Sequence, residues 1–236
     1  TLKHMILLAD HFGIILIPIS LIYKFFPSAA TLLIIQALFV SFSVIPLYLI
    51  IKHISKDIIL SLLFSISYLI SPGIVSAINF DFHLGTISVL PISILLYTWY
   101  FKKWGAYWTV LIISLFFKED LPFFLTGLGL YQLYVGQKSI GIVTFILAVI
   151  SLIAIKFYIM PFAWPTGGQT YVTTSTLPLT NPIDLVAFIT MRPNSILEII
   201  FNSPVKIQTL DILLKPFAYL SVISPLTWFS VFPYLF

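Results

Sequence analysis

The chain has 236 residues, of which 60% are hydrophobic and only 8% are charged, with a formal net charge of +4. Soluble domains carry about 25% charged residues, so this composition excludes a soluble protein and predicts one that crosses a membrane several times. The absence of cysteine excludes disulfides, thiolate nucleophiles and zinc–cysteine sites. The basic residues are scattered through short polar gaps, which indicates topology signals rather than nucleic-acid binding. Because the chain begins at Thr1 and ends within an apolar run, we expect a fragment of a longer protein.

The first apolar run covers residues 12–26 and is interrupted by Pro18. We interpret it as a helix that lies at the membrane interface or re-enters the membrane, because it is too short and too interrupted to span. Asp10 and His11 would head this helix, where an acid is favoured and a histidine can donate to phosphate oxygens. The alternative is a simple helix cap followed by an interfacial histidine.

Longer apolar runs follow, and about 20 residues suffice to cross the hydrocarbon core. Five runs are long enough: 28–51, 57–78, 84–101, 139–160 and 214–236. Two shorter runs, 104–118 and 121–136, could form a thin hairpin. Asp120 followed by Pro122 predicts a helix start at the second of them. We therefore predict one membrane domain, 1–236, that is an all-α bundle of about seven transmembrane helices.

The polar gaps between these runs alternate between the two sides of the membrane. The gaps on one side contain a single acid, Asp57, and five lysines: Lys52, Lys56, Lys102, Lys103 and Lys138. By the positive-inside rule, these gaps face the cytoplasm. The gaps on the other side face outward, provided that 12–26 does not cross, and they contain Asp10, His11, Asp81, His83, Lys118, Glu119 and Asp120. The polar segment 161–213 is also outward, and we expect a loop with short amphipathic helices near 182–191 and 194–202.

The most informative polar stretch is Asn79-Phe80-Asp81-Phe82-His83, which separates two apolar runs. Asp81 and His83 could share a divalent metal ion, act as a general base with its orienting partner, or hold a phosphate through a metal. The alternative is that both lie in the wet interfacial zone and cap the following helix. Ionisable groups at the membrane edge are costly to bury, and for that reason they often have a function. The functional and the structural interpretation therefore have about equal support.

Lys118-Glu119-Asp120 is the densest charged cluster and lies on the same predicted side as Asp81. Its lysine could neutralise a lipid-linked phosphate, while an acid beside it could bind metal or deprotonate an acceptor hydroxyl. The alternative is a solvated turn in which Asp120 only caps a helix.

Other sequence features narrow the choice of function. Gly127 and Gly129 lie within an apolar run without a preceding strand, so they predict helix packing rather than a nucleotide loop. No phosphate-binding loop that ends in Lys and Ser or Thr, and no His-Glu-x-x-His helix, occurs in the sequence. ATP-driven transport and zinc peptidase chemistry therefore lack support. The aromatic residues around Lys102 and Lys103 predict an interfacial belt.

The order of these features resembles the domain of unknown function 2079 family, a family of predicted prokaryotic multi-pass membrane proteins. The resemblance covers nearly the whole chain, and its most specific elements are Phe80-Asp81-Phe82-His83 and Lys118-Glu119-Asp120. That family in turn resembles the glycosyltransferase C superfamily, polytopic enzymes that place essential acids in their outer loops. The resemblance implies an enzyme of the cell membrane that moves a sugar from a polyprenyl-phosphate carrier to an acceptor on the outer face.

The resemblance also implies residue roles. By position, Asp81 with His83 corresponds to the second acidic motif of the superfamily, and the first acid would lie upstream of Thr1 unless Asp10 serves. The expected catalytic residues are Asp81, Glu119 and Asp120. The expected substrate-binding residues are His11, His83 and Lys118. A divalent metal ion would be held by Asp81 and His83. Membrane lipid and a lipid-linked sugar donor are the expected partners, and nucleic acid is not.

Two other functions stay open at this point. A transporter or channel would need ionisable residues near the membrane midplane, but runs such as 58–70 and 140–155 contain none. A non-catalytic membrane subunit is the other alternative, because the upstream acid is missing. The enzyme requires that Asp81 and the carboxylates of Glu119 and Asp120 converge at the outer rim of a lipid-accessible groove.

Overall fold

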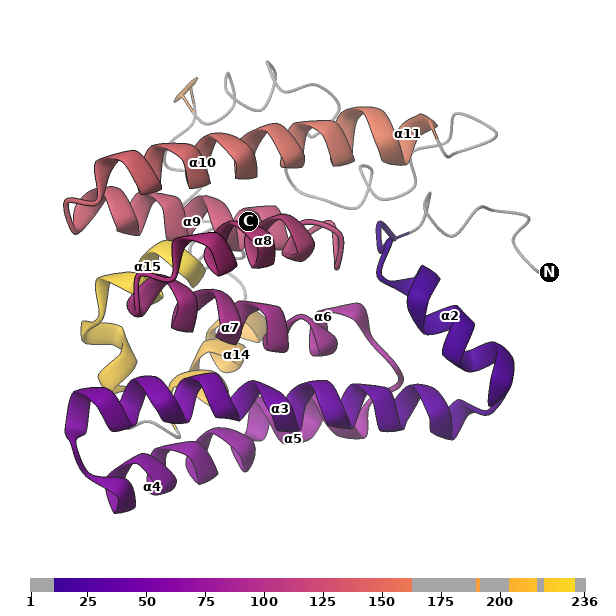
Figure 1. The fold of residues 1–236 in the computed structure, drawn as a ribbon, viewed down its shortest axis with the longest axis horizontal. Coiled ribbons are helices and arrows are strands. Elements are labelled where there is room, and N and C mark those ends of the chain that lie inside the picture. The colour runs from indigo at the N-terminus through magenta and orange to yellow at the C-terminus, as the bar shows by residue number, and fades with distance from the viewer. Residues whose placement is uncertain (1–10, 163–189, 192–203, 216–218, 232–236) are drawn as a thin grey trace. The chain divides into compact units, whose positions relative to one another are not determined.

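A computed structural model describes residues 11–162, 190–191, 204–215 and 219–231 (Figure 1). All regular elements in these ranges are helices, which confirms the predicted all-α class. The chain divides into two compact units. The first unit is Gly13–Lys118, and the second combines Thr1–Phe12 with Glu119–Phe236. Asp10, the predicted helix 194–202 and most of the predicted helix 182–191 lie outside the described residues.

The first unit is built around one long helix, α3 (Ala29–Ser55). On opposite sides of α3 lie α4 (Ile58–Leu69) and α7 (Val89–Tyr100), and α8 (Trp104–Ser114) packs on α7 (Figure 1). The remaining helices of this unit are α2 (Leu16–Phe25), α5 (Pro72–Asn79) and α6 (Leu84–Ile87).

The second unit is built around a hairpin of α9 (Leu121–Tyr134) and α10 (Lys138–Ile153), which lie side by side (Figure 1). A Cβ on Gly129 would lie 2.7 Å from the backbone nitrogen of Phe145, and one on Gly141 would lie 2.8 Å from the carbonyl oxygen of Gly129. The two backbones therefore pack directly against each other, as small residues permit in membrane helices. This packing confirms the interpretation of Gly129 as a helix-contact residue.

The rest of the second unit continues α10 and adds short elements near the C-terminus. A π-helical turn, η1 (Ala154–Ile159), and α11 (Met160–Phe162) extend α10. Three elements follow later in the chain: α14 (Pro204–Leu214), η3 (Leu220–Ile223) and α15 (Pro225–Val231). The helix predicted for 214–236 is therefore wrong as one continuous element. A proline inside a helix removes a backbone donor and clashes with the preceding turn, and accordingly α14 ends before Pro216 and α15 begins at Pro225.

Two described helices, Ala29–Ser55 and Lys138–Phe162, are long and apolar enough to cross a membrane. They correspond to the predicted spans 28–51 and 139–160. The predicted span 57–78 is a bent pair, α4 and α5, with a 45° angle at the break. Pro72 begins α5, a position that proline tolerates because its missing N–H has no partner there. Leu84–Tyr100 and Trp104–Ser114 are shorter apolar helices, and the total of about seven spans stays a prediction.

The helix in the run 12–26 differs from the expectation in two respects. It begins at Leu16, so His11 does not head it as predicted. Pro18 lies in its first turn, where the backbone N–H would have no helical partner, and so Pro18 does not interrupt it. Only Ile19 is buried along α2, which leaves most of its apolar surface exposed.

Candidate functional site

Asp81 and His83 lie on the short connection between α5 and α6, and a buried amide holds this connection in place. Gln36 of α3 is fully buried. Its Nε2 donates to the carbonyl oxygen of Ala77, 3.1 Å away, and its Oε1 accepts the backbone N–H of His83 at 2.8 Å. One side chain therefore fixes both the end of α5 and the start of α6.

The sequence interpretation did not single out Gln36. The available signal was its position as the one amide within the apolar run 28–51. An amide inside a membrane helix favours partners on neighbouring segments, because lipid offers none. Gln36 is thus a positioning residue for the connection that carries Asp81.

The side chains of Asp81 and His83 are both exposed. His83 occupies the position before α6, but its side chain makes no capping hydrogen bond. Its ring instead meets the Phe80 ring edge-on, with 5.9 Å between centroids. Asp81 makes no hydrogen bond or ion pair with any residue in the described part of the chain. The predicted capping of the next helix by these side chains is therefore wrong, whereas their placement in the wet interfacial zone stays a prediction.

Lys118 reaches the same place from the segment after α8. A Cβ on Gly85 would lie 3.7 Å from Lys118 Nζ and 3.9 Å from Cδ2 of the His83 ring. The ammonium and the imidazole therefore border one point on the first turn of α6. We call Asp81, His83 and Lys118 together the Asp81 end of the first unit.

Four of the five lysines predicted to face the cytoplasm lie at the other end of the first unit, and the fifth, Lys138, belongs to the second unit. We call this end of the first unit the basic end, and its members are Lys52, His53, Lys56, Lys102 and Lys103. The segment of α3 from Gln36 to His53 spans about 25 Å at ~1.5 Å per residue, close to the roughly 30 Å of a hydrocarbon core. Within the first unit, the residues that the sequence assigned to opposite sides are thus at opposite ends of one helix. Which face of the membrane each end meets stays a prediction.

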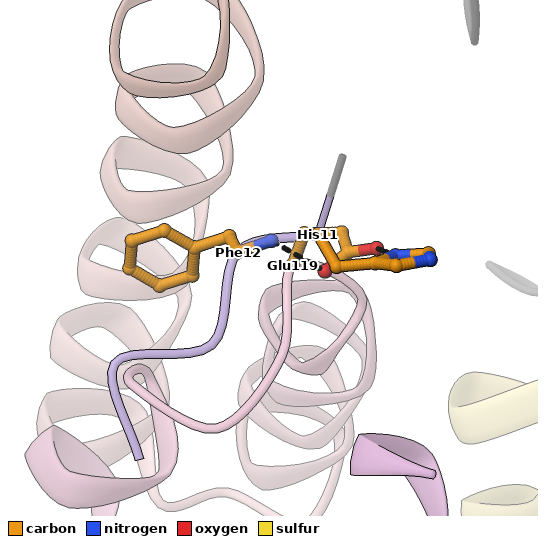
Figure 2. A network of polar contacts seen from close by, with 3 residues as sticks. All are labelled: His11, Phe12 and Glu119. Carbon is orange, nitrogen blue, oxygen red and sulfur yellow. Dashed lines mark hydrogen bonds and ion pairs between the residues drawn. The ribbon is translucent and has the colours of Figure 1, made fainter. Parts of the chain in front are cut away.

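Glu119 and His11, predicted to lie on one side, are in direct contact within the second unit (Figure 2). Oε1 of Glu119 is 3.0 Å from Nδ1 of His11, and Oε2 accepts the backbone N–H of Phe12 at 3.1 Å. Figure 2 shows the carboxylate between these two nitrogens. The side chain of Glu119 is only 7% exposed, against 39% for His11.

In this arrangement, each oxygen of the buried Glu119 carboxylate has a nitrogen partner, which offsets the cost of burying its charge. A buried carboxylate without such partners would be strongly destabilising. With Glu119 ionised, Nδ1–H of His11 is the donor, which sets the tautomer and the orientation of the ring. The pair can therefore present an oriented imidazole, and it joins two segments 108 residues apart.

Asp120 precedes α9, so the predicted helix start at Asp120 and Pro122 is confirmed. Its side chain makes no capping hydrogen bond, however, and the predicted cap is therefore wrong. Pro122 lies in the first turn, where it is tolerated. Asp120 is half-buried.

Metal binding and convergence of the acids stay predictions. Asp81 and His83 offer two donor groups, and the described residues contain no group of three or more His, Asp or Glu placed to hold a metal ion. Asp81 belongs to the first unit, whereas Glu119 and Asp120 belong to the second.

Comparison with known proteins identifies a family for this chain. No curated protein and no solved structure matches the chain. The family model described as "Predicted membrane protein (DUF2079)" matches residues 1–236, the full length of the chain. The chain therefore belongs to the domain of unknown function 2079 family of predicted membrane proteins, as its motifs implied.

Proposed function

We propose that this protein is a membrane enzyme that transfers a sugar from a polyprenyl-phosphate carrier to an acceptor hydroxyl at the Asp81 end. One observation carries the proposal. The Lys118 ammonium and the His83 ring border the same point at Gly85, and the carboxylate of Asp81, two residues before His83, is exposed. A cation and an imidazole suit a phosphate group, and an exposed carboxylate on the same connection suits a general base.

The reaction divides between these groups. The acceptor oxygen attacks the anomeric carbon of the sugar, and the bond from that carbon to the phosphate oxygen breaks. Asp81 takes the proton of the acceptor hydroxyl. The phosphate leaves on the polyprenyl carrier, and Lys118 and His83 stabilise its developing charge. The apolar helix surfaces of the first unit accommodate the polyprenyl chain in the surrounding lipid.

Glu119 and His11 have a supporting role in this proposal. Both oxygens of Glu119 already accept hydrogen bonds, so proton transfer to Glu119 would weaken one of them. Asp81 is the better general base, because it is exposed and has no partner among the described residues. Within the second unit, Glu119 orients the ring of His11.

The proposed reaction takes place on the outer face of the cell membrane. The support is electrostatic: the basic end carries four lysines and, by the positive-inside rule, belongs in the cytoplasm. The Asp81 end lies about 25 Å away along α3 and would then meet the outer leaflet, where it could receive a lipid-linked sugar and an external acceptor.

The experiment is a transfer assay with the full-length protein in liposomes and a panel of radiolabelled polyprenyl-phosphate sugars. We expect Asp81→Asn to lower the transfer rate by about 100-fold or more, the usual effect of losing a general base. Asp57→Asn is the matched control. It removes the acid of the basic end while asparagine still caps α4, so its transfer rate should equal that of the wild type.

Glu119→Gln tests the supporting role of Glu119 separately from the proton transfer to Asp81. The amide oxygen can still accept one hydrogen bond, so we expect a smaller loss of transfer than for Asp81→Asn. Wild-type protein that transfers no sugar from the panel, or an Asp81→Asn variant as active as the wild type, would contradict the proposal.

A further inference from the structure

The basic end joins two turns that are distant in the sequence. His53 follows Lys52 on the last turn of α3, and its Nδ1 is 3.0 Å from the hydroxyl oxygen of Tyr100 at the end of α7. The His53 ring also meets the Phe101 ring edge-on, with 5.1 Å between centroids. These contacts bring the turn at 52–57 and the turn at 101–103 into one surface.

The positive charge of this surface is not neutralised within the first unit. Asp57 is its one acid, and Oδ1 of Asp57 accepts the backbone N–H groups of Ile59 and Leu60 at 2.7 and 3.1 Å. Asp57 therefore caps α4 instead of pairing with a lysine. The other acid in the sequence 13–118 is Asp81, at the opposite end of α3.

The four lysines of the basic end differ in their contacts. Lys52 lies over the Tyr48 ring at 5.7 Å, and Lys103 lies over the Tyr97 ring at 4.7 Å and donates to its hydroxyl oxygen. The side chains of Lys56 and Lys102 are exposed, and neither makes a hydrogen bond or ion pair with a residue that the structure describes.

Lys56 and Lys102 also share an unfavourable backbone conformation. Their φ angles are 58° and 54°, and they are two of the three described non-glycine residues with positive φ. Each follows the C-terminus of a helix, Lys56 after α3 and Lys102 after α7. Glycine is the usual residue at such a position, because a Cβ is strained there. Lysine thus occupies a position that favours glycine twice on one surface.

We propose that the basic end is a docking surface for anionic phospholipid head groups of the leaflet that it meets. Strain in the backbone persists where the side chain has a use. Cationic side chains at the membrane surface attract anionic lipids, and Tyr97 and Tyr100 are aromatic residues of the kind that lie at head-group level. Lys56 and Lys102 supply the ammonium groups that contact the lipid phosphate.

Two simpler explanations account for part of this pattern. Cations near a helix C-terminus interact favourably with the helix dipole, and lysines on one side determine topology. Both effects would operate equally well with lysines elsewhere in the last turn. Neither explains why lysine occupies the left-handed position after both helices.

The experiment measures binding of dioleoylphosphatidylglycerol and dioleoylphosphatidylcholine to the full-length protein in detergent by native mass spectrometry. We expect the wild type to prefer the anionic lipid. The Lys56→Gly/Lys102→Gly variant should lose about 10-fold or more of its affinity for the anionic lipid. Its melting temperature should be equal or higher, because glycine relieves the strain at both positions.

A charge-preserving control and a second neutral variant complete the test. Lys56→Arg/Lys102→Arg should keep the preference for the anionic lipid. Lys56→Asn/Lys102→Asn, which also tolerates positive φ, should lose it even if the glycine variant fails to fold. Equal affinity of the wild type for the two lipids, or full retention of the preference in the neutral variants, would overturn the proposal.

Discussion

The two ends of the first unit are stabilised in opposite ways. At the Asp81 end, a fully buried side chain, Gln36, holds the connection between α5 and α6 while Asp81 and His83 stay exposed. At the basic end, the contacts are on the surface: the Asp57 cap, the His53–Tyr100 hydrogen bond and two lysines over tyrosine rings. The comparison teaches that buried hydrogen bonds support the backbone at one end, whereas the other end displays charge on its surface.

The largest effect on stability is expected from removing the buried support. Gln36→Leu leaves the carbonyl of Ala77 and the N–H of His83 without their partner, and should lower the free energy of unfolding by about 1–3 kcal/mol. An SDS titration in bicelles would measure this change. Leu38→Met, exposed on the same helix, is the control and should change it by less than about 0.5 kcal/mol. Wild-type stability in the Gln36 variant would show that the Asp81 end does not depend on this amide.

An intermediate effect is expected from the cap at the basic end. Asp57→Ala removes the acceptor for the N–H groups of Ile59 and Leu60, and should cost about 1 kcal/mol. Asp57→Asn keeps an acceptor and should match the wild type. The same unfolding measurement decides between them. Equal stability of the Ala and Asn variants would mean that the side chain of residue 57 does not cap α4.

The smallest effect is expected from the exposed contact between the two turns. His53→Ala removes the hydrogen bond to Tyr100, and should change the free energy of unfolding by about 0.5 kcal/mol or less, as is usual at surface sites. Tyr100→Phe removes the same hydrogen bond and keeps the ring, so it serves as the control. A loss larger than that of Gln36→Leu would reverse the comparison of the two ends.

The sequence predicted the distribution of charge better than it predicted contacts. Counting apolar runs separates Asp81 and His83 from the lysines of the basic end, because each run long enough to cross moves the chain to the other side. The structure has these groups at opposite ends of α3. The helix start at Asp120 and the packing role of Gly129 also followed from local rules.

The features that could not be predicted from the sequence are contacts between segments that are distant along the chain. Gln36 and His83 are 47 residues apart, and His11 and Glu119 are 108 apart, so neither pair is visible in a local pattern. The sequence predicts that α2 starts near His11 because a polar pair before an apolar run is typical of a helix start, whereas His11 pairs with Glu119. It also predicts an interruption at Pro18, but the effect of a proline depends on whether the helix begins before or after it.

The separation of the two ends across the membrane is tested most directly by labelling single cysteines. Residues 1–236 contain no cysteine, so Asp81→Cys and Lys102→Cys each introduce one thiol into this part of the protein. In intact cells expressing the full-length protein, with any cysteine outside residues 1–236 replaced by serine, a membrane-impermeant maleimide should label the residue 81 variant. The residue 102 variant should react only after the membrane is permeabilised. Labelling of both variants in intact cells would contradict the opposite placement of the two ends.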